Sequence, residues 1–394
     1  MDRIIFHIDV NNAFLSWSAK YLLQNGSKLD IREIPSVIGG DEQRRAGIVL
    51  AKSTIAKKFG IVTGETLYSA RRKCPGLKIY PPMHTFYQEQ SNLLFNHLKN
   101  YSPDIETFSI DECFLDYGKV KKLYGDQLSF ANKLKDEIKE KLGFTVNIGI
   151  GNNKLCAKMA SDFSKPNQVH TLYMNEVEEK IWPLPIEELF GIGRKTSPKL
   201  HDLNINYIRD LANADYSALY PYFKNQTAIL IDKAKGIDNE PVISERPEYK
   251  GVSNTKTLPK DLTTKEEIFN ALRGVAENIG ISLRKDNRYA KVITIILKDC
   301  YFKVYTHQKK LKNATNLNLE IFNIAKKLVN EIWDETPIRL VGIRADNLVN
   351  ELNYQVSLFD SFEDVKKLSK LDETVDKLKD KYGVDIIKTA NSDK

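Results

Sequence analysis

The chain has 394 residues and a mass of 45.1 kDa, which is enough for about two to four domains. Hydrophobic residues make up 42% and charged residues 28% of it, so it is neither a disordered nor a collagen-like chain, and no apolar run indicates a signal peptide or a membrane span. Its four cysteines lie far apart without a CxxC pair, which excludes a readable disulfide framework or cysteine zinc site and predicts reduced thiols in the cytoplasm.

The net charge of +7 is concentrated in one stretch. Residues 245–350 carry nineteen Lys and Arg against thirteen Asp and Glu, whereas residues 361–394 carry eight of each sign. A basic segment of this kind suits a surface that follows the phosphates of a polyanion. A solvated lysine-rich face explains the same charge equally well.

Short strands and helices are expected to alternate in the first hundred residues. An apolar, β-branched run at 4–10 indicates a buried strand that ends near Asp9, and Asn11 or Asn12 is placed to cap the helix that follows. The further expected elements are a helix at 13–24, a hairpin of 33–38 and 47–51 with its turn at 39–41, and helices at 54–59, 66–73 and 84–100.

An acidic pair separates two strand-like runs in the next segment. The runs are 105–110 and 113–117, and Asp111-Glu112 lies between them. A helix at 126–142, a strand at 144–150 and a helix at 154–163 follow. This order predicts an α+β fold, a split βαβ sheet of the ferredoxin-like kind with an insertion after its first strand.

The pattern changes after Pro166 to short helices with glycine turns, which continue to about residue 235. A charged stretch with two prolines at 236–249 indicates a linker. Residues 251–349 then alternate strand and helix, with strands expected at 291–297, 301–306 and 338–345. Everything after residue 350 is expected to be a tail that contains a charged amphipathic helix at 362–383.

Asp9, Asp111 and Glu112 are the first candidate functional residues. In a split βαβ sheet the first strand lies beside the hairpin, so the three carboxylates are expected to meet at one edge. Crowded carboxylates raise one another's pKa unless cations neutralise them, and a few hard oxygen ligands favour Mg²⁺. Two such ions about 4 Å apart would clamp the attacking and leaving oxygens of a phosphoryl transfer. The alternative is that Asp9 caps a helix and that Asp111-Glu112 occupies a solvated turn.

Several sequence segments match the motifs of one known family, and they occur in the same order. They are Phe6-His7-Ile8-Asp9 with Ala13-Phe14, Val37-Ile38-Gly39-Gly40, Ala56-Lys57-Lys58-Phe59-Gly60-Ile61, Ser109-Ile110-Asp111-Glu112 before Cys113-Phe114-Leu115-Asp116, Gly149-Ile150-Gly151-Asn152-Asn153-Lys154-Leu155-Cys156-Ala157-Lys158, and Ser164-Lys165-Pro166-Asn167. Together they span residues 1 to about 350. In these segments the chain closely resembles the Y-family DNA polymerases of the bacterial DNA polymerase IV and UmuC type.

The resemblance implies a set of domains and a metal site. The implied domains are a ferredoxin-like palm at 1–11 and 81–172, inserted fingers at 12–80, a helix-hairpin-helix thumb at 173–236, a linker at 237–250, an α/β little finger at 251–350 and a clamp-binding tail at 351–394. Asp9, Asp111 and Glu112 become the catalytic carboxylates. With the Val10 carbonyl they are expected to bind two Mg²⁺ ions.

The resemblance also implies a nucleotide site. Backbone amides near Ala13 and Phe14 are expected to hold the incoming triphosphate, with Phe14 as the aromatic steric gate against a ribose 2′-hydroxyl. Lys165 matches the family's triphosphate-binding lysine. The chain departs from many relatives in carrying Thr54 and Lys57 where they have Tyr and Arg. Lys57 can meet a phosphate as a point charge but cannot bind it bidentately, so base stacking and lesion tolerance are expected to differ.

Two further segments are expected to bind partners. The glycine turn resembles the family's helix-hairpin-helix, whose amides and cations contact the DNA backbone, at Gly191, Gly193, Arg194 and Lys195. Taken alone, the Gly-x-Gly turn is better explained as an ordinary helix-helix loop. The segment at 355–360 resembles the short bacterial peptide that docks in the sliding β-clamp, with anchors at Gln355, Leu358 and Phe359. The alternative is a last strand that turns back on its domain.

The favoured hypothesis is a template-directed DNA polymerase of the translesion type, a nucleotidyltransferase that adds dNTPs to a primer 3′-hydroxyl. The family implies low fidelity, no proofreading domain, a role in DNA repair, mutagenesis and the SOS response, and a bacterial cytoplasmic, nucleoid-associated monomer. Two other classes stay open. Gly39-Gly40-Asp41-Glu42 mimics a diguanylate cyclase signature, although Gln43 breaks that pattern, and a catalytically silent clamp-binding scaffold would keep the fold without synthesis.

Overall fold

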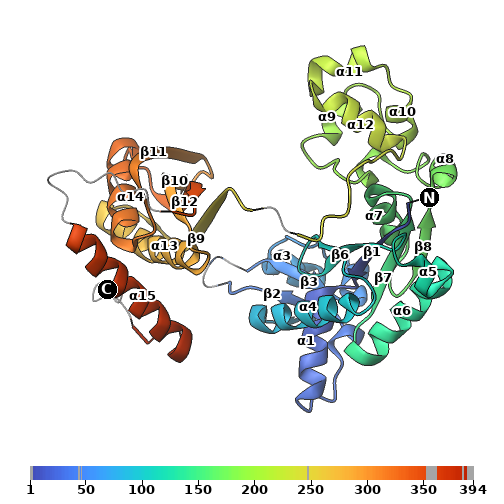
Figure 1. Ribbon diagram of the computed structural model, residues 1–394, viewed down its shortest axis with the longest axis horizontal. Helices are drawn as coiled ribbons and strands as arrows, with labels where there is room; N and C mark the ends of the chain where they lie inside the picture. Colours follow the sequence, from blue (N-terminus) through green and yellow to red (C-terminus); the bar gives the residue numbers. More distant parts are fainter. Residues whose placement is uncertain are drawn as a thin grey trace. The chain divides into compact units, whose positions relative to one another are not determined.

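A computed structural model describes residues 3–42, 45, 47–245, 248–351, 362–383 and 386–387. The chain divides into two units, and each is described by itself (Figure 1). The first unit is Met1–Gly40 with Ile48–Arg246, and the second is Asp41–Gly47 with Pro247–Lys394. Among the helices of the described residues, none combines the length and the apolar character that a membrane span requires.

The main sheet of the first unit has five strands in the order β5-β6-β1-β7-β8. Their bounds are β1 Ile5–Val10, β5 Ile105–Thr107, β6 Glu112–Asp116, β7 Val146–Gly151 and β8 Val169–Leu172. The central strand β1 is antiparallel to both β6 and β7 and is buried along its whole length. A strand covered on both faces reads as a continuous apolar run, which is why the sequence pattern found it.

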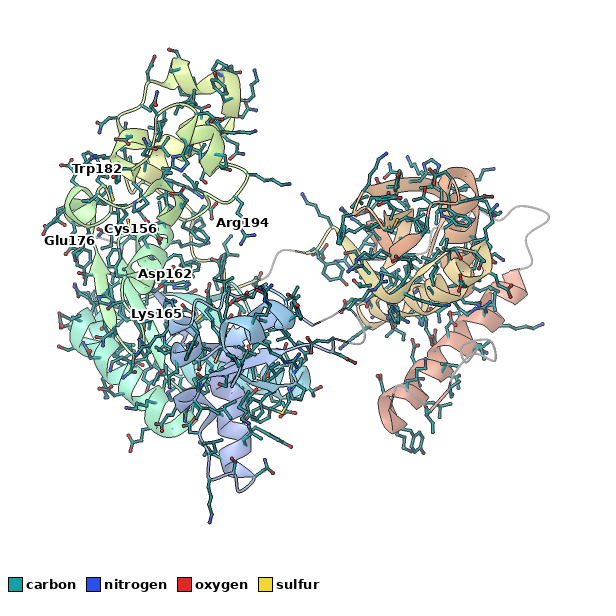
Figure 2. All side chains as sticks on the ribbon, turned by 180° about the vertical axis from the view of Figure 1, so that it is seen from behind. Cys156, Asp162, Lys165, Glu176, Trp182 and Arg194 are labelled. Atoms are coloured by element: carbon teal, nitrogen blue, oxygen red, sulfur yellow. The ribbon has the colours of Figure 1, made fainter. Side chains whose placement is uncertain are left out.

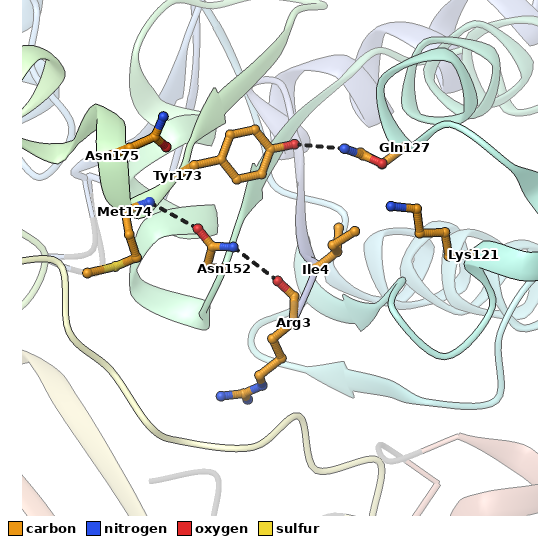
Figure 3. A pocket seen from close by; sticks show the side chains of 8 residues that line it. All are labelled: Arg3, Ile4, Lys121, Gln127, Asn152, Tyr173, Met174 and Asn175. Atoms are coloured by element: carbon orange, nitrogen blue, oxygen red, sulfur yellow. Dashed lines mark hydrogen bonds between the residues drawn. The ribbon is translucent and has the colours of Figure 1, made fainter. Parts of the chain in front are cut away.

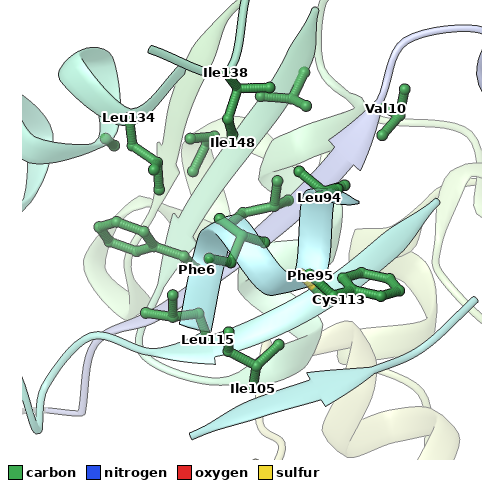
Figure 4. Close-up of a cluster of buried hydrophobic side chains, with 14 of the residues drawn as sticks. Phe6, Val10, Leu94, Phe95, Ile105, Cys113, Leu115, Leu134, Ile138 and Ile148 are labelled. Carbon is green, nitrogen blue, oxygen red and sulfur yellow. The ribbon is translucent and has the colours of Figure 1, made fainter. Parts of the chain in front are cut away.

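Helices cover both faces of this sheet, and alternation along β1 decides which side chains face which layer. Phe6, Ile8 and Val10 enter the core under α4 (His84–Lys99) and α6 (Gln127–Leu142), as Figure 4 shows. Ile5 packs on the opposite face against Ala157 of α7 (Lys154–Asp162). Asp9 has the same parity as Ile5, so its side chain lies on the α7 face.

A smaller three-stranded sheet, β3-β2-β4, lies between α1 and α4 in the chain. Its strands are β2 Ser36–Gly39, β3 Val49–Lys52 and β4 Lys78–Tyr80. The helices of this part of the chain are α1 Ala13–Gln24, η1 Ile31–Glu33, α2 Thr54–Lys58 and α3 Leu67–Lys73. Strands β2 and β3 form the predicted antiparallel pair, whereas β4, which the sequence pattern missed, runs parallel to β2.

Short helices follow the main sheet and pack on α7. Their bounds are η2 Met174–Glu176, α8 Val177–Lys180, η3 Ile186–Glu188, α9 Ser197–His201, α10 Ile208–Ala212, α11 Tyr216–Phe223 and α12 Gln226–Ala234; the short helix α5 (Lys121–Tyr124) is not among them, because it precedes α6 and contacts that helix. Leu155 and Met159 of α7 share one buried cluster with apolar residues of these helices. The opposite side of α7 packs on the sheet, so this helix connects the two layers.

The second unit has a four-stranded antiparallel sheet, β11-β10-β12-β9, with two helices packed on it. The bounds are β9 Gly251–Leu262, α13 Lys265–Lys285, β10 Tyr289–Asp299, β11 Val304–Thr315, α14 Asn318–Ile332, β12 Ile338–Val349 and α15 Phe362–Tyr382. Helix α15 does not stand free, because Asp372 and Asp376 bond to Arg284 of α13.

The α+β fold predicted from the sequence is confirmed, and two local expectations are wrong. Glu112 is the first residue of β6 and pairs within the sheet, so it does not belong to a solvated turn. Asn12 is the N-cap residue of α1, yet among the described residues its side chain makes no capping hydrogen bond. The Asn11 side chain instead accepts a hydrogen bond from the backbone N–H of Asn167 at 2.8 Å.

Candidate active site

The strand pairing brings the three predicted carboxylates to one end of the main sheet. Asp9 on β1 lies directly opposite Glu112 on β6 in the antiparallel register. The backbone N–H of Val10 donates to the Asp111 carbonyl oxygen at 3.1 Å, which places Asp111 one step further along the same edge. Residues separated by about a hundred positions in the sequence are therefore neighbours in the sheet.

Two lysines bind these carboxylates in the structure. Lys165 forms an ion pair with Asp9, and Lys158 of α7 donates to Glu112 at 3.0 Å. The other carboxylate oxygen of Glu112 lies 3.5 Å from the ring of His7. The Asp111 carboxylate accepts a hydrogen bond of 2.6 Å from the Ser109 hydroxyl.

Burial and these neighbours give the carboxyl groups different pKa values. Burial raises the pKa of Asp9 to about 6, although Lys165 works in the opposite direction. Burial also raises the pKa of Asp111. Burial opposes the ionisation of Glu112 too, yet His7 and Lys158 outweigh it and lower the pKa of Glu112 to about 2. One strongly ionised carboxylate therefore lies beside two whose charge costs free energy unless a cation is near.

The donor set fits hard divalent cations. It consists of carboxylate oxygens at a sheet edge, which are the ligands that Mg²⁺ prefers. As the side chains stand, no group of three His, Cys, Asp or Glu in the described part of the chain encloses a metal position. The ammonium groups of Lys158 and Lys165 form ion pairs with Glu112 and Asp9 instead. These lysines therefore neutralise the two carboxylates at the position where metal ions are expected.

A cavity of about 180 Å³ lies beside Lys165 and contains the three predicted phosphate-site side chains. The described residues that line it are Asn11, Asn12, Lys52, Ser53, Thr54, Lys57, Lys165 and Pro166. Thr54 and Lys57 come from the first turns after β3, and Lys165 comes from the turn after α7. Lys52 is a third cation in this cavity, and both burial and the charge of Lys57 lower its pKa. A cavity with three lysines suits a polyanion such as a triphosphate.

The Lys-Pro-Asn turn is held against the sheet by asparagine side chains. Asn11 accepts from the backbone N–H of Asn167 and donates to the Asn147 side chain at 3.1 Å. Asn147 in turn donates to the carbonyl oxygen of Ser164 at 2.6 Å. These contacts fix Lys165 beside β1 and explain why it reaches Asp9.

Phe14 lies one residue inside α1 and contacts a cluster of aromatic rings. Its ring stacks on Tyr87 with centroids 4.5 Å apart and meets His84 edge-on at 6.1 Å. Tyr87 and Trp17 are fully buried, while Phe14 is half-buried. Packing on one side therefore holds the ring in place and leaves part of it accessible. Ala13 is the first residue of the helix, where backbone N–H groups have no intrahelical partner.

The glycine turn lies between η3 and α9. Gly191 has φ of 99°, a conformation that favours glycine, and Gly193 accepts the hydrogen bonds that begin the next helix. Arg194 and Lys195 are exposed, and Figure 2 labels Arg194 on this loop. The glycine turn therefore has a helical segment on either side, as the predicted helix-hairpin-helix requires. The clamp residues Gln355, Leu358 and Phe359 lie outside the described residues.

A second cavity, of about 620 Å³, lies elsewhere in the first unit and is drawn in Figure 3. Its described lining contains none of the site residues predicted from the sequence. Tyr173 accepts a hydrogen bond there from Gln127 at 3.2 Å, and Asn152 bridges Arg3 to Met174 through backbone groups.

Sequence reasoning missed several residues that complete the site. Lys158 and His7 lie within the matching segments but received no role, and Lys52 and Asn11 were not considered as site residues. Periodicity marks Lys158 only as one residue of an amphipathic helix, and a buried histidine in a strand reads as core. The packing of α7 on β1 and β7 brings Lys158 to Glu112, and no local pattern in the sequence shows this contact.

Comparisons with known proteins agree with this geometry. The profile of the impB/mucB/samB family matches residues 8–162, that of the impB/mucB/samB family C-terminal domain matches residues 249–358, and that of the IMS family HHH motif matches residues 175–205. DNA polymerase IV of Clostridium acetobutylicum is 46% identical over 388 residues, covering 98% of this chain and 97% of that protein. DNA polymerase IV 1 of Bacillus subtilis is 33% identical over 390 residues, covering 98% and 92%. A solved Y-family DNA polymerase chimera superposes with a TM-score of 0.77 at 26% identity, covering 88% of this chain and all of that one.

Proposed function

Because the chain belongs to the Y family of DNA polymerases, we propose that its synthesis centre is the sheet edge formed by Asp9, Asp111 and Glu112. The protein is a DNA-directed DNA polymerase of the translesion type, which acts on primer-template DNA and dNTPs. The observation that carries the proposal is the register of β1 and β6, which sets Asp9 opposite Glu112 beside a cavity with three lysines.

Asp9, Asp111 and Glu112, with the Val10 carbonyl, would hold two Mg²⁺ ions in this proposal. When bound, such ions neutralise charge on the attacking and leaving oxygens of a phosphoryl transfer. The chain's own contribution is to orient the carboxylates through β-sheet pairing. Lys158 donates to one oxygen of Glu112 and the His7 ring lies 3.5 Å from the other, so both side chains help to orient this carboxylate.

The incoming dNTP would place its phosphates at the start of α1 and in the lysine cavity. Unpaired N–H groups near Ala13 and Phe14 and the positive end of the helix macrodipole favour an anion there. Lys57 and Lys165 add charge, with Thr54 as a hydroxyl neighbour, and Lys52 is a further cation of the same cavity. The accessible side of the Phe14 ring would exclude a ribose 2′-hydroxyl.

DNA would be held through its backbone on two surfaces. One is the turn with Gly191, Gly193, Arg194 and Lys195, and the other is the basic second unit. Contacts of this kind are insensitive to base sequence and weaken as salt rises. Gln355, Leu358 and Phe359 would attach a monomeric enzyme to the sliding β-clamp, in the cytoplasm at the nucleoid, and the family's link to the SOS response would apply.

Primer extension with single dNTPs tests this proposal. Wild-type chain should extend a matched primer with dNTPs and Mg²⁺ and reject rNTPs, whereas Asp111→Asn and Glu112→Gln should abolish extension and leave primer-template binding intact. Asp136→Asn on α6 is the matched control, since it makes the same chemical change on a helix that packs against the other face of the sheet. Full extension by either active-site variant would exclude the assigned centre, and no synthesis by the wild type would favour a silent scaffold.

A further inference from the structure

A chain of alternating charges crosses the candidate active site. It runs from Asp9 to Lys165, from Lys165 to Asp162 at 2.9 Å, from Asp162 to Lys158 at 3.4 Å, and from Lys158 to Glu112 at 3.0 Å. Asp9 and Glu112 at its ends are the proposed metal ligands. Among the described residues, Asp162 in the middle is the one acid that both lysines share, and Figure 2 labels it near Lys165.

The end of α7 sets this geometry. Asp162 is the last residue of the helix, one turn after Lys158 and three residues before Lys165. Residues four positions apart lie on the same face of a helix, so the side chains of Lys158 and Asp162 both point toward the sheet edge. The Lys158 side chain is 9% exposed and that of Asp162 is 48% exposed. Asp162 therefore lies at the rim, between the buried lysine and the solvent.

The lysines and the proposed ions compete for the same oxygens. An ion that binds Asp9 or Glu112 must displace an ammonium group or share a carboxylate with it. Lys165 can then turn to the triphosphate, but a displaced Lys158 without an acid would remain as an unpaired cation beside a divalent ion, which is unfavourable at short range. Asp162 already forms ion pairs with both lysines, and these pairs can persist when Asp9 and Glu112 bind metal ions.

We infer that Asp162 is a positioning residue that retains Lys158 and Lys165 while Asp9 and Glu112 bind divalent ions, and so sets how tightly those ions bind. This inference rests on the proposed metal site. With Asp162 present, Asp9, Asp111, Glu112 and Asp162 carry four negative charges against two lysines. Removing the charge of Asp162 halves the net negative charge of this set and leaves the lysines to bind only the metal ligands.

In water, the attraction between one unit charge at the rim and a nearby divalent ion corresponds to about a fivefold change in the ion's affinity. Asp162→Asn should therefore raise the Mn²⁺ concentration needed for half-saturation about fivefold. The maximal rate at saturating metal should stay close to that of the wild type, because Asp162 touches neither primer nor nucleotide. A merely structural helix-end pair would instead change thermal stability and leave metal affinity unaltered.

The test uses the full chain with a dideoxy-terminated primer-template and a non-hydrolysable dNTP. Bound Mn²⁺ is counted by electron paramagnetic resonance of the free ion, and Mg²⁺ dependence of extension is measured separately. The Asp162→Glu variant should bind Mn²⁺ with wild-type affinity, and the control variant Asp136→Asn should also leave the Mn²⁺ affinity unchanged. Thermal unfolding of each variant shows that it is folded.

Three results decide the matter. Weaker Mn²⁺ binding in Asp162→Asn with rescue by Asp162→Glu supports the inference. Unchanged Mn²⁺ binding in Asp162→Asn overturns it, provided that Asp111→Asn in the same assay loses an ion. If Asp111→Asn also retains both ions, the proposed metal site itself is wrong, and the inference falls with it.

Discussion

Helix α15 is held on the second unit by several polar contacts, and the loss of Arg284 should loosen it. Asn318 also donates twice to Asp372, and Lys379 of α15 pairs with Glu277. Arg284 of α13 donates from Nε and Nη2 to the two oxygens of Asp376 at 2.6 and 2.9 Å, and from Nη1 to Asp372 at 3.3 Å. The side chain of Arg284 is 7% exposed, and those of Asp372 and Asp376 are 16% and 18% exposed. These are nearly buried, partly bidentate ion pairs, which are far stronger than surface pairs.

Arg284→Met should cost about 3–5 kcal/mol in local stability, the range for a buried pair that loses one partner. Apolar packing does not compensate fully, because Leu371 and Val375 border a cavity of about 290 Å³ against α14. Asp376 would lose both of its bonds to Arg284, while Asp372 would keep those from Asn318, so hydration of the Asp376 carboxylate favours movement of α15 away from α13. Most of the stability of a helix in a protein comes from its tertiary packing, so a detached α15 should then fray as well.

Hydrogen exchange followed by mass spectrometry measures this effect directly. Amide protection in α15 should fall at least about a hundredfold in Arg284→Met, since each 1.4 kcal/mol corresponds to a factor of ten. Protection in α13 and α14 should remain. Lys260→Met is the control, because Lys260 pairs with Glu267 at 3.1 Å while 77% exposed and should change stability by less than about 0.5 kcal/mol. Wild-type protection of α15 in Arg284→Met would refute the reasoning.

Three further changes have defined outcomes. Phe14→Val should admit rNTPs in single-nucleotide extension by at least about tenfold over the wild type, since the ring that would meet the 2′-hydroxyl is gone, and unchanged discrimination would remove Phe14 from the gate role. Gly149→Ala should destabilise the first unit by about 2–4 kcal/mol in urea unfolding, because the new Cβ would lie 2.0 Å from the carbonyl oxygen of Ala157. The control Gly274→Ala, on an open helix surface, should be neutral or stabilising by up to about 1 kcal/mol. Equal effects of the two substitutions would contradict the packing argument. Deleting residues 355–359 should abolish stimulation by the sliding clamp and keep distributive synthesis, and persisting stimulation would show that the clamp binds elsewhere.

Periodicity predicted the elements whose pattern arises from burial on a regular face. The 13–24 helix, the 84–100 helix and the buried first strand were found because their apolar residues repeat with the period of the element. Strand β4 has only three residues and pairs in parallel with β2, so neither alternation nor a hairpin turn marks it. The docking of α15 also left no local signal, since its partners Arg284, Asn318 and Glu277 lie far away in the sequence.

The site residues that belong to recognisable sequence motifs were predicted, and those whose roles depend on tertiary contacts were missed. Asp9, Asp111 and Glu112 stand out as acids beside apolar strands, and the family resemblance named them. Lys158 and Asp162 are ordinary helix residues in the sequence, and their roles depend on how α7 lies on the sheet. Charge partners at long separation depend on tertiary packing, which a single sequence does not encode in any local pattern.

Anomalous diffraction from a Mn²⁺-soaked crystal of the full chain with primer-template and a non-hydrolysable dNTP tests the central claim most directly. We predict two manganese peaks about 4 Å apart, bonded to oxygens of Asp9, Asp111 and Glu112, with Lys165 turned from Asp9 to the triphosphate. Manganese peaks away from all three carboxylates, while the dNTP is bound and the Lys165–Asp9 ion pair persists, would contradict it.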